Sequence, residues 1–126
     1  MTAGADRILV VEDDEVLRET LEEVMIDEGH EVRSAGNGLA ALELLETWTP
    51  ELIILDLMMP FMDAYEFRVR QRARDLAPDA RILILSAARD LQGAADRIAA
   101  DAWLPKPFRL SEVIETVDRL LQDRVA

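Results

Sequence analysis

Three runs of consecutive apolar residues stand out along the chain, at residues 8–11, 52–55 and 82–85. Each run is continuous rather than alternating with polar residues. This is the pattern of a strand buried on both faces, as in a parallel sheet covered by helices. Residues 30–35 form a weaker fourth candidate with one face less buried, and residues 103–105 form a fifth. The pattern therefore predicts five strands, three of them central.

Between these strands, apolar residues recur at helical spacing. The first helix carries one apolar face made by Leu17, Leu21, Val24 and Met25. Asp14 is placed to cap its beginning and Gly29 to end it. The order of this region is therefore strand, helix, strand.

Four further helices are expected. After a turn at residues 36–38, the second helix carries Leu39, Leu42 and Leu45 and stops before Pro50. A less regular third helix fills roughly residues 65–74, and a short alanine-rich fourth lies between residues 90 and 100. The last begins with Ser111 as its cap and Glu112 in its first turn.

Strand and helix thus alternate five times, which predicts an α/β doubly wound fold with right-handed crossovers. A chain of 126 residues is long enough for one domain with a sizeable core. We expect a single domain over residues 1–126, with a core of about 7–122, a loose start at residues 1–6 and no output domain in this chain. Ligands of such folds bind beyond the carboxyl ends of the strands.

Reactive side chains stand at these predicted carboxyl ends. Glu12, Asp13 and Asp14 follow the first run, and the three later strands run into Asp56, Ser86 and Lys106. Parallel strands would bring these groups to one edge of the sheet. Carboxylates packed closely together repel one another, and a hard divalent cation such as Mg²⁺ relieves that repulsion. The edge is therefore predicted to bind a divalent cation and a phosphoryl group, with Asp13 and Asp56 as direct ligands and Glu12 acting through water.

Each of these residues also has an ordinary structural reading. The acids after the first strand could simply cap a helix, and Ser86 alone would be an unremarkable residue at a strand end. Lysine is most often an exposed surface residue. Lys106, however, is the only lysine beside thirteen arginines, and it lies between two prolines. Matching positions at four strand ends favour function over the structural readings.

Four segments, in this order, resemble the receiver domain of bacterial two-component response regulators. They are Ile-Leu-Val-Val-Glu-Asp-Asp (8–14), Leu-Ile-Ile-Leu-Asp-Leu-Met-Met-Pro (52–60), Ile-Leu-Ile-Leu-Ser-Ala (82–87) and Leu-Pro-Lys-Pro-Phe (104–108). The resemblance covers about residues 7–122. It implies a flavodoxin-like sheet of five parallel strands in the order 2-1-3-4-5.

The resemblance also implies roles for individual residues. Asp56 would be the phosphoacceptor, and Glu12, Asp13, Asp56 and the main-chain carbonyl of Met58 would hold Mg²⁺. Lys106 and Ser86 would act on the phosphoryl group. Ser86 and Trp103 would be the switch residues, and the bond between Lys106 and Pro107 would be cis.

The chain departs from the family pattern in several places. Phe61 and Ala64 stand where the family often has glycine, so the loop after Asp56 is expected to turn differently. Ala99 or Ala100 replaces a common glycine before the fifth strand. The segment 86–106 is about two residues shorter than usual, and Trp103 is bulkier than the common Tyr or Phe.

The implied function is a phosphorylation-driven switch. A sensor histidine kinase or a phosphotransfer protein would be the donor, and a homodimer through the face of the fourth helix, fifth strand and fifth helix is one candidate contact. Such a domain catalyses only its own phosphorylation and dephosphorylation. A true phosphohydrolase would need a second acid two residues after Asp56, where this chain has Met58. The third alternative is an interaction module that keeps the fold without being phosphorylated.

Composition narrows the classes further. The net charge of −12 argues against non-specific nucleic-acid binding. The sequence shows no signal peptide, no apolar stretch of membrane-spanning length and no cysteine. These features predict a cytoplasmic protein without disulfide or thiolate chemistry.

Overall fold

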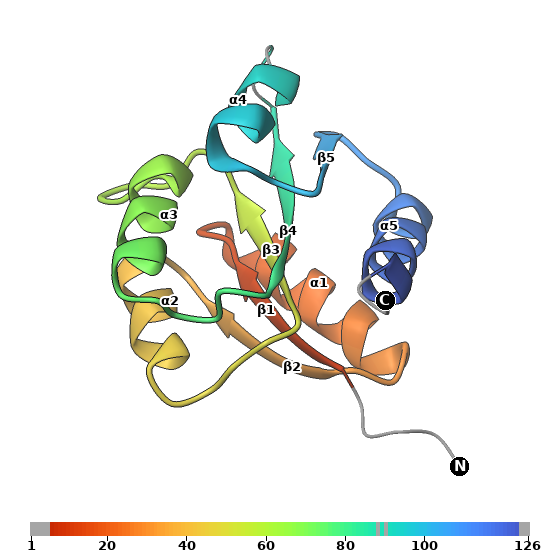
Figure 1. The fold of residues 1–126 in the computed structure, drawn as a ribbon. Coiled ribbons are helices and arrows are strands. Elements are labelled where there is room, and N and C mark those ends of the chain that lie inside the picture. The colour runs from red at the N-terminus through yellow and green to blue at the C-terminus, as the bar shows by residue number, and fades with distance from the viewer. Residues whose placement is uncertain (1–5, 88, 90, 124–126) are drawn as a thin grey trace.

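The computed structural model describes residues 6–87, 89 and 91–123 as a five-stranded parallel sheet flanked by five helices (Figure 1). The strands are β1 (Arg7–Val11), β2 (Glu31–Ala35), β3 (Leu52–Asp56), β4 (Arg81–Ser86) and β5 (Ala102–Pro105). The helices are α1 (Glu15–Asp27), α2 (Gly38–Leu45), α3 (Ala64–Ala73), α4 (Leu91–Ile98) and α5 (Leu110–Asp123). The strand order β2-β1-β3-β4-β5 confirms the predicted doubly wound fold.

Two hydrophobic cores lie on opposite faces of the sheet. Successive residues of a strand point to opposite faces. Ile8 and Val10 belong to the core that includes residues of α1 and α5, while Leu9 and Val11 belong to the core that includes residues of α2, α3 and α4. All four side chains are fully buried. This burial on both faces explains why the central strands are continuous apolar runs.

The beginnings of the helices follow the expected chemistry in part. The Asp14 carboxylate accepts a hydrogen bond from the Leu17 N–H at 3.2 Å, so the predicted cap of α1 is confirmed. Gly38, expected in a turn, is instead the first residue of α2. Asn37 caps that helix by accepting from the Ala40 N–H at 2.8 Å.

The predicted cap of α5 is wrong. The helix begins at Leu110, so Ser111 lies within its first turn. The Arg109 carbonyl accepts from the Val113 N–H, and the Glu112 carboxylate reaches back to the Arg109 N–H at 2.8 Å. A glutamate three residues into a helix stabilises its start in this way even without a serine cap.

Three helices end in the same hydrogen-bonded turn, with a residue in the left-handed region after the last turn. In α1 and α3 this residue is Gly29 (φ 94°) and Asp75 (φ 54°). In α4 it is Ala99 (φ 61°), where the N–H groups of Ala99 and Ala100 donate to the carbonyls of Asp96 and Ala95. Ala99 therefore occupies a conformation that favours glycine.

Replacing Ala99 by glycine is expected to stabilise the domain by about 0.5–1 kcal/mol. The left-handed conformation costs an L-residue about 1–2 kcal/mol, and glycine avoids this strain. Glycine loses more backbone entropy on folding than alanine, which cancels roughly half of the gain. The Ala99 methyl group is exposed, so little packing is lost. Urea unfolding measures the change, and Ala100→Gly, which removes a partly buried methyl group, should destabilise instead. Equal changes in the free energy of unfolding for the two variants would contradict backbone strain at Ala99.

Candidate functional site

The carboxyl ends of four strands meet at one edge of the sheet. Val11 lies opposite Leu55, Asp56 opposite Leu85, and Ser86 opposite Pro105. The residues after β1 and β5 are Glu12 and Lys106. The register therefore brings together the groups that the sequence placed at separate strand ends.

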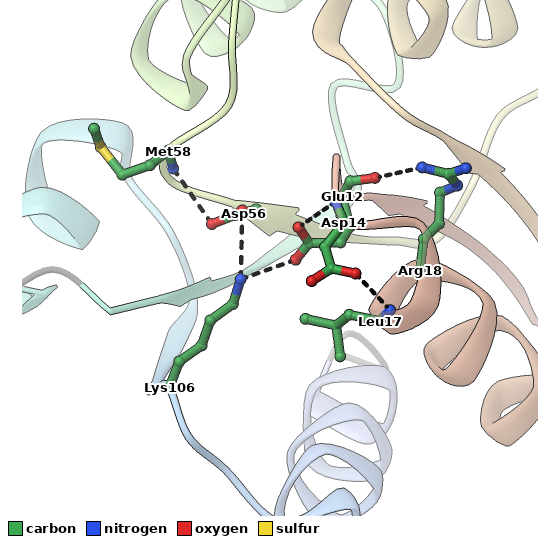
Figure 2. A network of polar contacts seen from close by, with 7 residues as sticks. All are labelled: Glu12, Asp14, Leu17, Arg18, Asp56, Met58 and Lys106. Carbon is green, nitrogen blue, oxygen red and sulfur yellow. Dashed lines mark hydrogen bonds and ion pairs between the residues drawn. The ribbon is translucent and has the colours of Figure 1, made fainter.

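A lysine bridges the two buried acids of this edge (Figure 2). Lys106 Nζ lies 3.1 Å from Glu12 Oε1 and 3.4 Å from Asp56 Oδ2. Both acids are buried, whereas Asp13 beside them is exposed. Carboxylate oxygens of Glu12, Asp13 and Asp56 all lie within 4.8 Å of one another. Three acids at this spacing form a set that could hold a metal ion.

The electrostatics of the pocket favour an added positive charge. Burial raises the pKa of Glu12 to about 7, and the charge of Asp56 adds to the effect. Burial also raises the pKa of Asp56, although Lys106 opposes the shift. For Lys106, burial acts to lower the pKa, but the hydrogen bond to Glu12 and the charge of Asp56 outweigh it, so the pKa is raised. A hard divalent cation fits this donor set because it offsets the burial of the charged carboxylates.

Main-chain N–H groups orient the two buried carboxylates. The Asp14 N–H donates to Glu12 Oε2 at 3.1 Å, and the Met58 N–H donates to Asp56 Oδ1 at 3.3 Å (Figure 2). Lys106 contacts the other oxygen of each acid. Each carboxylate is therefore held at both oxygens, which limits its rotation.

Arg18 is a site residue that the sequence reasoning missed. Its guanidinium donates to the Glu12 carbonyl at 2.9 Å, so it supports the acidic segment from α1 (Figure 2). A side chain on Gly36 would come within 3.1 Å of this guanidinium. The only sequence signal for Arg18 is its place one turn into the helix that follows the acids.

The remaining expected site residues lie on β4, β5 and the segment that follows. Ser86 is buried at the end of β4, and its carbonyl accepts from the Lys106 N–H at 2.8 Å. Trp103 lies on β5 with 38% of its surface exposed. The peptide bond between Lys106 and Pro107 is cis.

The loop between β3 and α3 has an unusual turn at Phe61. This residue has φ 70°, and the Met62 N–H donates to the Pro60 carbonyl at 2.8 Å across it. Its side chain is 93% exposed, so no burial compensates for the strained backbone. Phe61 therefore adopts a glycine-like conformation at this departure from the family pattern. Ala64, the other departure in this loop, is the first residue of α3.

Together, the fold and the acidic edge define a doubly wound α/β protein with a metal-competent carboxylate pocket at the ends of its strands. The chain belongs to the response regulator receiver domain family, whose model matches residues 8–118.

Individual relatives agree with this assignment. The response regulator MprA of Mycobacterium sp. (strain KMS) is 39% identical over 92% of this chain and 50% of that protein. The structure of the chemotaxis protein CheY4 of Vibrio cholerae has a TM-score of 0.85 and 28% identity, covering 94% of this chain and 99% of that one. The response regulator TrrA of Thermotoga maritima, solved in complex with Mg²⁺–BeF, has a TM-score of 0.78 and 33% identity, covering 91% and 98%.

The chain spans about half the length of the curated relatives that it matches. Among the residues that the structure describes, no helix has both the length and the apolar composition needed to cross a membrane.

Proposed function

We propose that this domain accepts a phosphoryl group on Asp56 in a Mg²⁺-dependent reaction and acts as a phosphorylation-driven switch. The observation that carries the proposal is the setting of the Asp56 carboxylate. It is buried, one oxygen accepts from the Met58 N–H, and the other lies against Lys106. A carboxylate held in this way has a fixed direction of attack, and positioning is the main protein contribution to phosphoryl transfer.

Asp13 and Asp56 are proposed as direct Mg²⁺ ligands, the Met58 carbonyl as a third, and Glu12 as a ligand through water. When bound, Mg²⁺ would neutralise charge on the phosphoryl oxygens. The relative TrrA, solved with Mg²⁺–BeF, supports this assignment. The spacing of the three carboxylates and the raised pKa of Glu12 support it independently.

Lys106 and Ser86 are proposed to contact the transferred group. Lys106 would move from its present pairing with Glu12 and Asp56 toward a phosphoryl oxygen, where its ammonium group neutralises developing charge. The Ser86 hydroxyl would donate to another phosphoryl oxygen. Movement of Ser86 toward the phosphoryl group would change the position of Trp103 and of the face made by α4, β5 and α5. The added charge would thus shift the equilibrium between two conformations of this face.

The proposed donor is a sensor histidine kinase or a phosphotransfer protein, and the proposed setting is the cytoplasm, as the resemblance to bacterial two-component regulators implies. The downstream target would bind the face of α4, β5 and α5, where a homodimer is one candidate. The domain is not proposed to turn over an outside substrate, because Met58 occupies the place of the second acid that phosphohydrolases use.

The labelling of the parent protein by acetyl phosphate tests the proposal. A gain of one phosphoryl group by intact-mass spectrometry, dependent on Mg²⁺, is expected. Without labelling, the domain would be an interaction module that keeps the fold. Sustained turnover of small phosphoesters would instead identify a phosphohydrolase.

Replacing Asp13 by alanine is expected to weaken Mg²⁺ binding by at least about tenfold, since a ligand should matter at least as much as an outer-shell partner. Titration calorimetry measures the affinity. Asp27→Ala removes an exposed carboxylate from the far end of α1 and serves as the control. Equal affinities for the Asp13 variant and the parent would place the metal elsewhere.

A further inference from the structure

A basic helix stands out in this acidic chain. The whole chain has 26 acidic and 14 basic residues. Nevertheless, α3 and its C-terminal cap carry four arginines, at positions 68, 70, 72 and 74. Two of them have carboxylate partners. Arg70 pairs with Glu66 at 2.7 Å, and Arg74 pairs with Glu46.

The other two arginines of α3, Arg68 and Arg72, contact α4. Arg97, on α4 itself, is the third arginine of this region. Within the described part of the chain, no carboxylate lies at ion-pair distance from any of the three. Arg68 Nε and Arg72 donate to the same acceptor, the Ile98 carbonyl, at 3.1 and 3.0 Å. Three guanidinium groups therefore gather at the end of α4 without a paired anion among the described residues.

Helix capping explains only part of this cluster. An arginine often satisfies a carbonyl at a helix C-terminus, but here two guanidiniums donate to one carbonyl. Burial and the charge of Arg72 lower the pKa of Arg68, and the charge of Asp101 offsets only part of this shift, so the guanidinium groups still repel one another. Arg97 donates to no acceptor among the contacts of the described residues and lies over the Tyr65 ring at 4.3 Å. An anion from outside would relieve the repulsion.

These side chains surround a groove of about 190 Å³ between α3 and α4. It is lined by Tyr65, Arg68, Val69, Arg72, Arg97 and Ile98. Val69 is 66% exposed, so the groove offers an apolar wall beside the guanidinium groups. The volume is smaller than that of typical small-molecule pockets and suits individual side chains.

We propose that this groove, the α3–α4 groove, is a docking surface for an acidic segment of a partner protein, with carboxylates on the arginines and an apolar side chain against Val69 and Tyr65. The charge of the groove complements such a segment, and arginine and tyrosine are both favoured at protein interfaces. A polynucleotide fits less well because its many phosphate charges are repelled by the net charge of −12 on the whole chain. A short acidic segment interacts mainly with the charges close to the groove. None of the residues proposed for the phosphorylation site lines the groove, so the groove is a separate site from the acidic pocket.

Fluorescence anisotropy with a fluorescein-labelled peptide of repeated Glu-Glu-Leu units tests the proposal on the whole domain. Arg97→Ala and Arg72→Ala should each weaken binding by about tenfold, which is the scale of an arginine that contributes strongly to an interface. Arg70→Ala, on the same helix but paired with Glu66, should stay within about twofold of the parent. Arg97 caps no carbonyl among the described contacts, so its variant should keep the fold even if Arg72→Ala loosens α4. Circular dichroism checks this.

Three outcomes would overturn the proposal. The first is an equal loss in the Arg97 and Arg70 variants, which would mean a diffuse charge effect. The second is an oligo-deoxythymidine of matched charge that binds more tightly than the peptide and depends on Arg97, which would make the partner a nucleic acid. The third is self-association of the parent, seen by light scattering and lost in Arg97→Ala, which would make the partner a second copy.

Acetyl phosphate labelling should be equal in all variants, so failure of the groove and failure of the phosphorylation site are distinguishable.

Discussion

Replacing Asp56 by asparagine is expected to abolish labelling by acetyl phosphate. The amide oxygen is a far weaker nucleophile than a carboxylate, and the pocket also loses one of its three carboxyl groups. The shape of the side chain and its contact with the Met58 N–H are retained, so the fold should be unaffected. Intact-mass spectrometry after incubation with acetyl phosphate and Mg²⁺ measures the result, and the added mass of one phosphoryl group should be undetectable.

Asp79→Asn is the matched control. Asp79 is exposed and precedes β4, at the opposite edge of the sheet from Asp56. This variant should be labelled like the parent. Labelling of the Asp56 variant at the parent yield would show that another residue is the phosphoacceptor.

Replacing Lys106 by alanine should leave Mg²⁺ binding intact but abolish the conformational response to phosphorylation. The ammonium group lies against Glu12 and Asp56, so its removal takes a competing positive charge from the pocket. Mg²⁺ affinity should be retained or rise by up to about tenfold. The response of β5 and α5 to phosphorylation should nevertheless be lost, because Lys106 directly follows the strand that carries Trp103.

Amide exchange with and without beryllofluoride, a phosphoryl mimic, measures this response. In the parent, protection should change around Trp103 and along α5. Arg109→Ala, which removes a nearby positive charge without contact to the acids, should behave like the parent. If the Lys106 variant shows the parental change in protection, the lysine is not the link and has only a structural role.

Much of the fold could be predicted because burial leaves a direct record in the sequence. The central strands β1 and β3 are covered on both sides, so they consist almost entirely of apolar residues. Parallel pairing then places Glu12, Asp56 and Lys106 at one edge, because each directly ends or follows its strand. The site was therefore predictable as a cluster before any distance was known.

What could not be predicted depends on side-chain reach and backbone geometry. Arg18 contacts the main chain of Glu12, and a carbonyl acceptor leaves no mark in the sequence. Ser111 is a good cap by residue type, but Glu112 already satisfies the Arg109 N–H, so the helix begins two residues earlier than a Ser111 cap predicts. The arginines of α3 differ only in the face that they occupy, which depends on the packing of α3 against α4.

The two cores on either side of the sheet bear on how this sequence can change over evolutionary time. Ile8 and Leu9 are adjacent in the chain, yet they belong to separate packing environments that share no buried neighbours. A volume change at Ile8 should be compensated by residues of its own core, which includes Leu21 and Val117. Covariation in relatives should therefore link alternate positions of β1, and adjacent positions should drift independently.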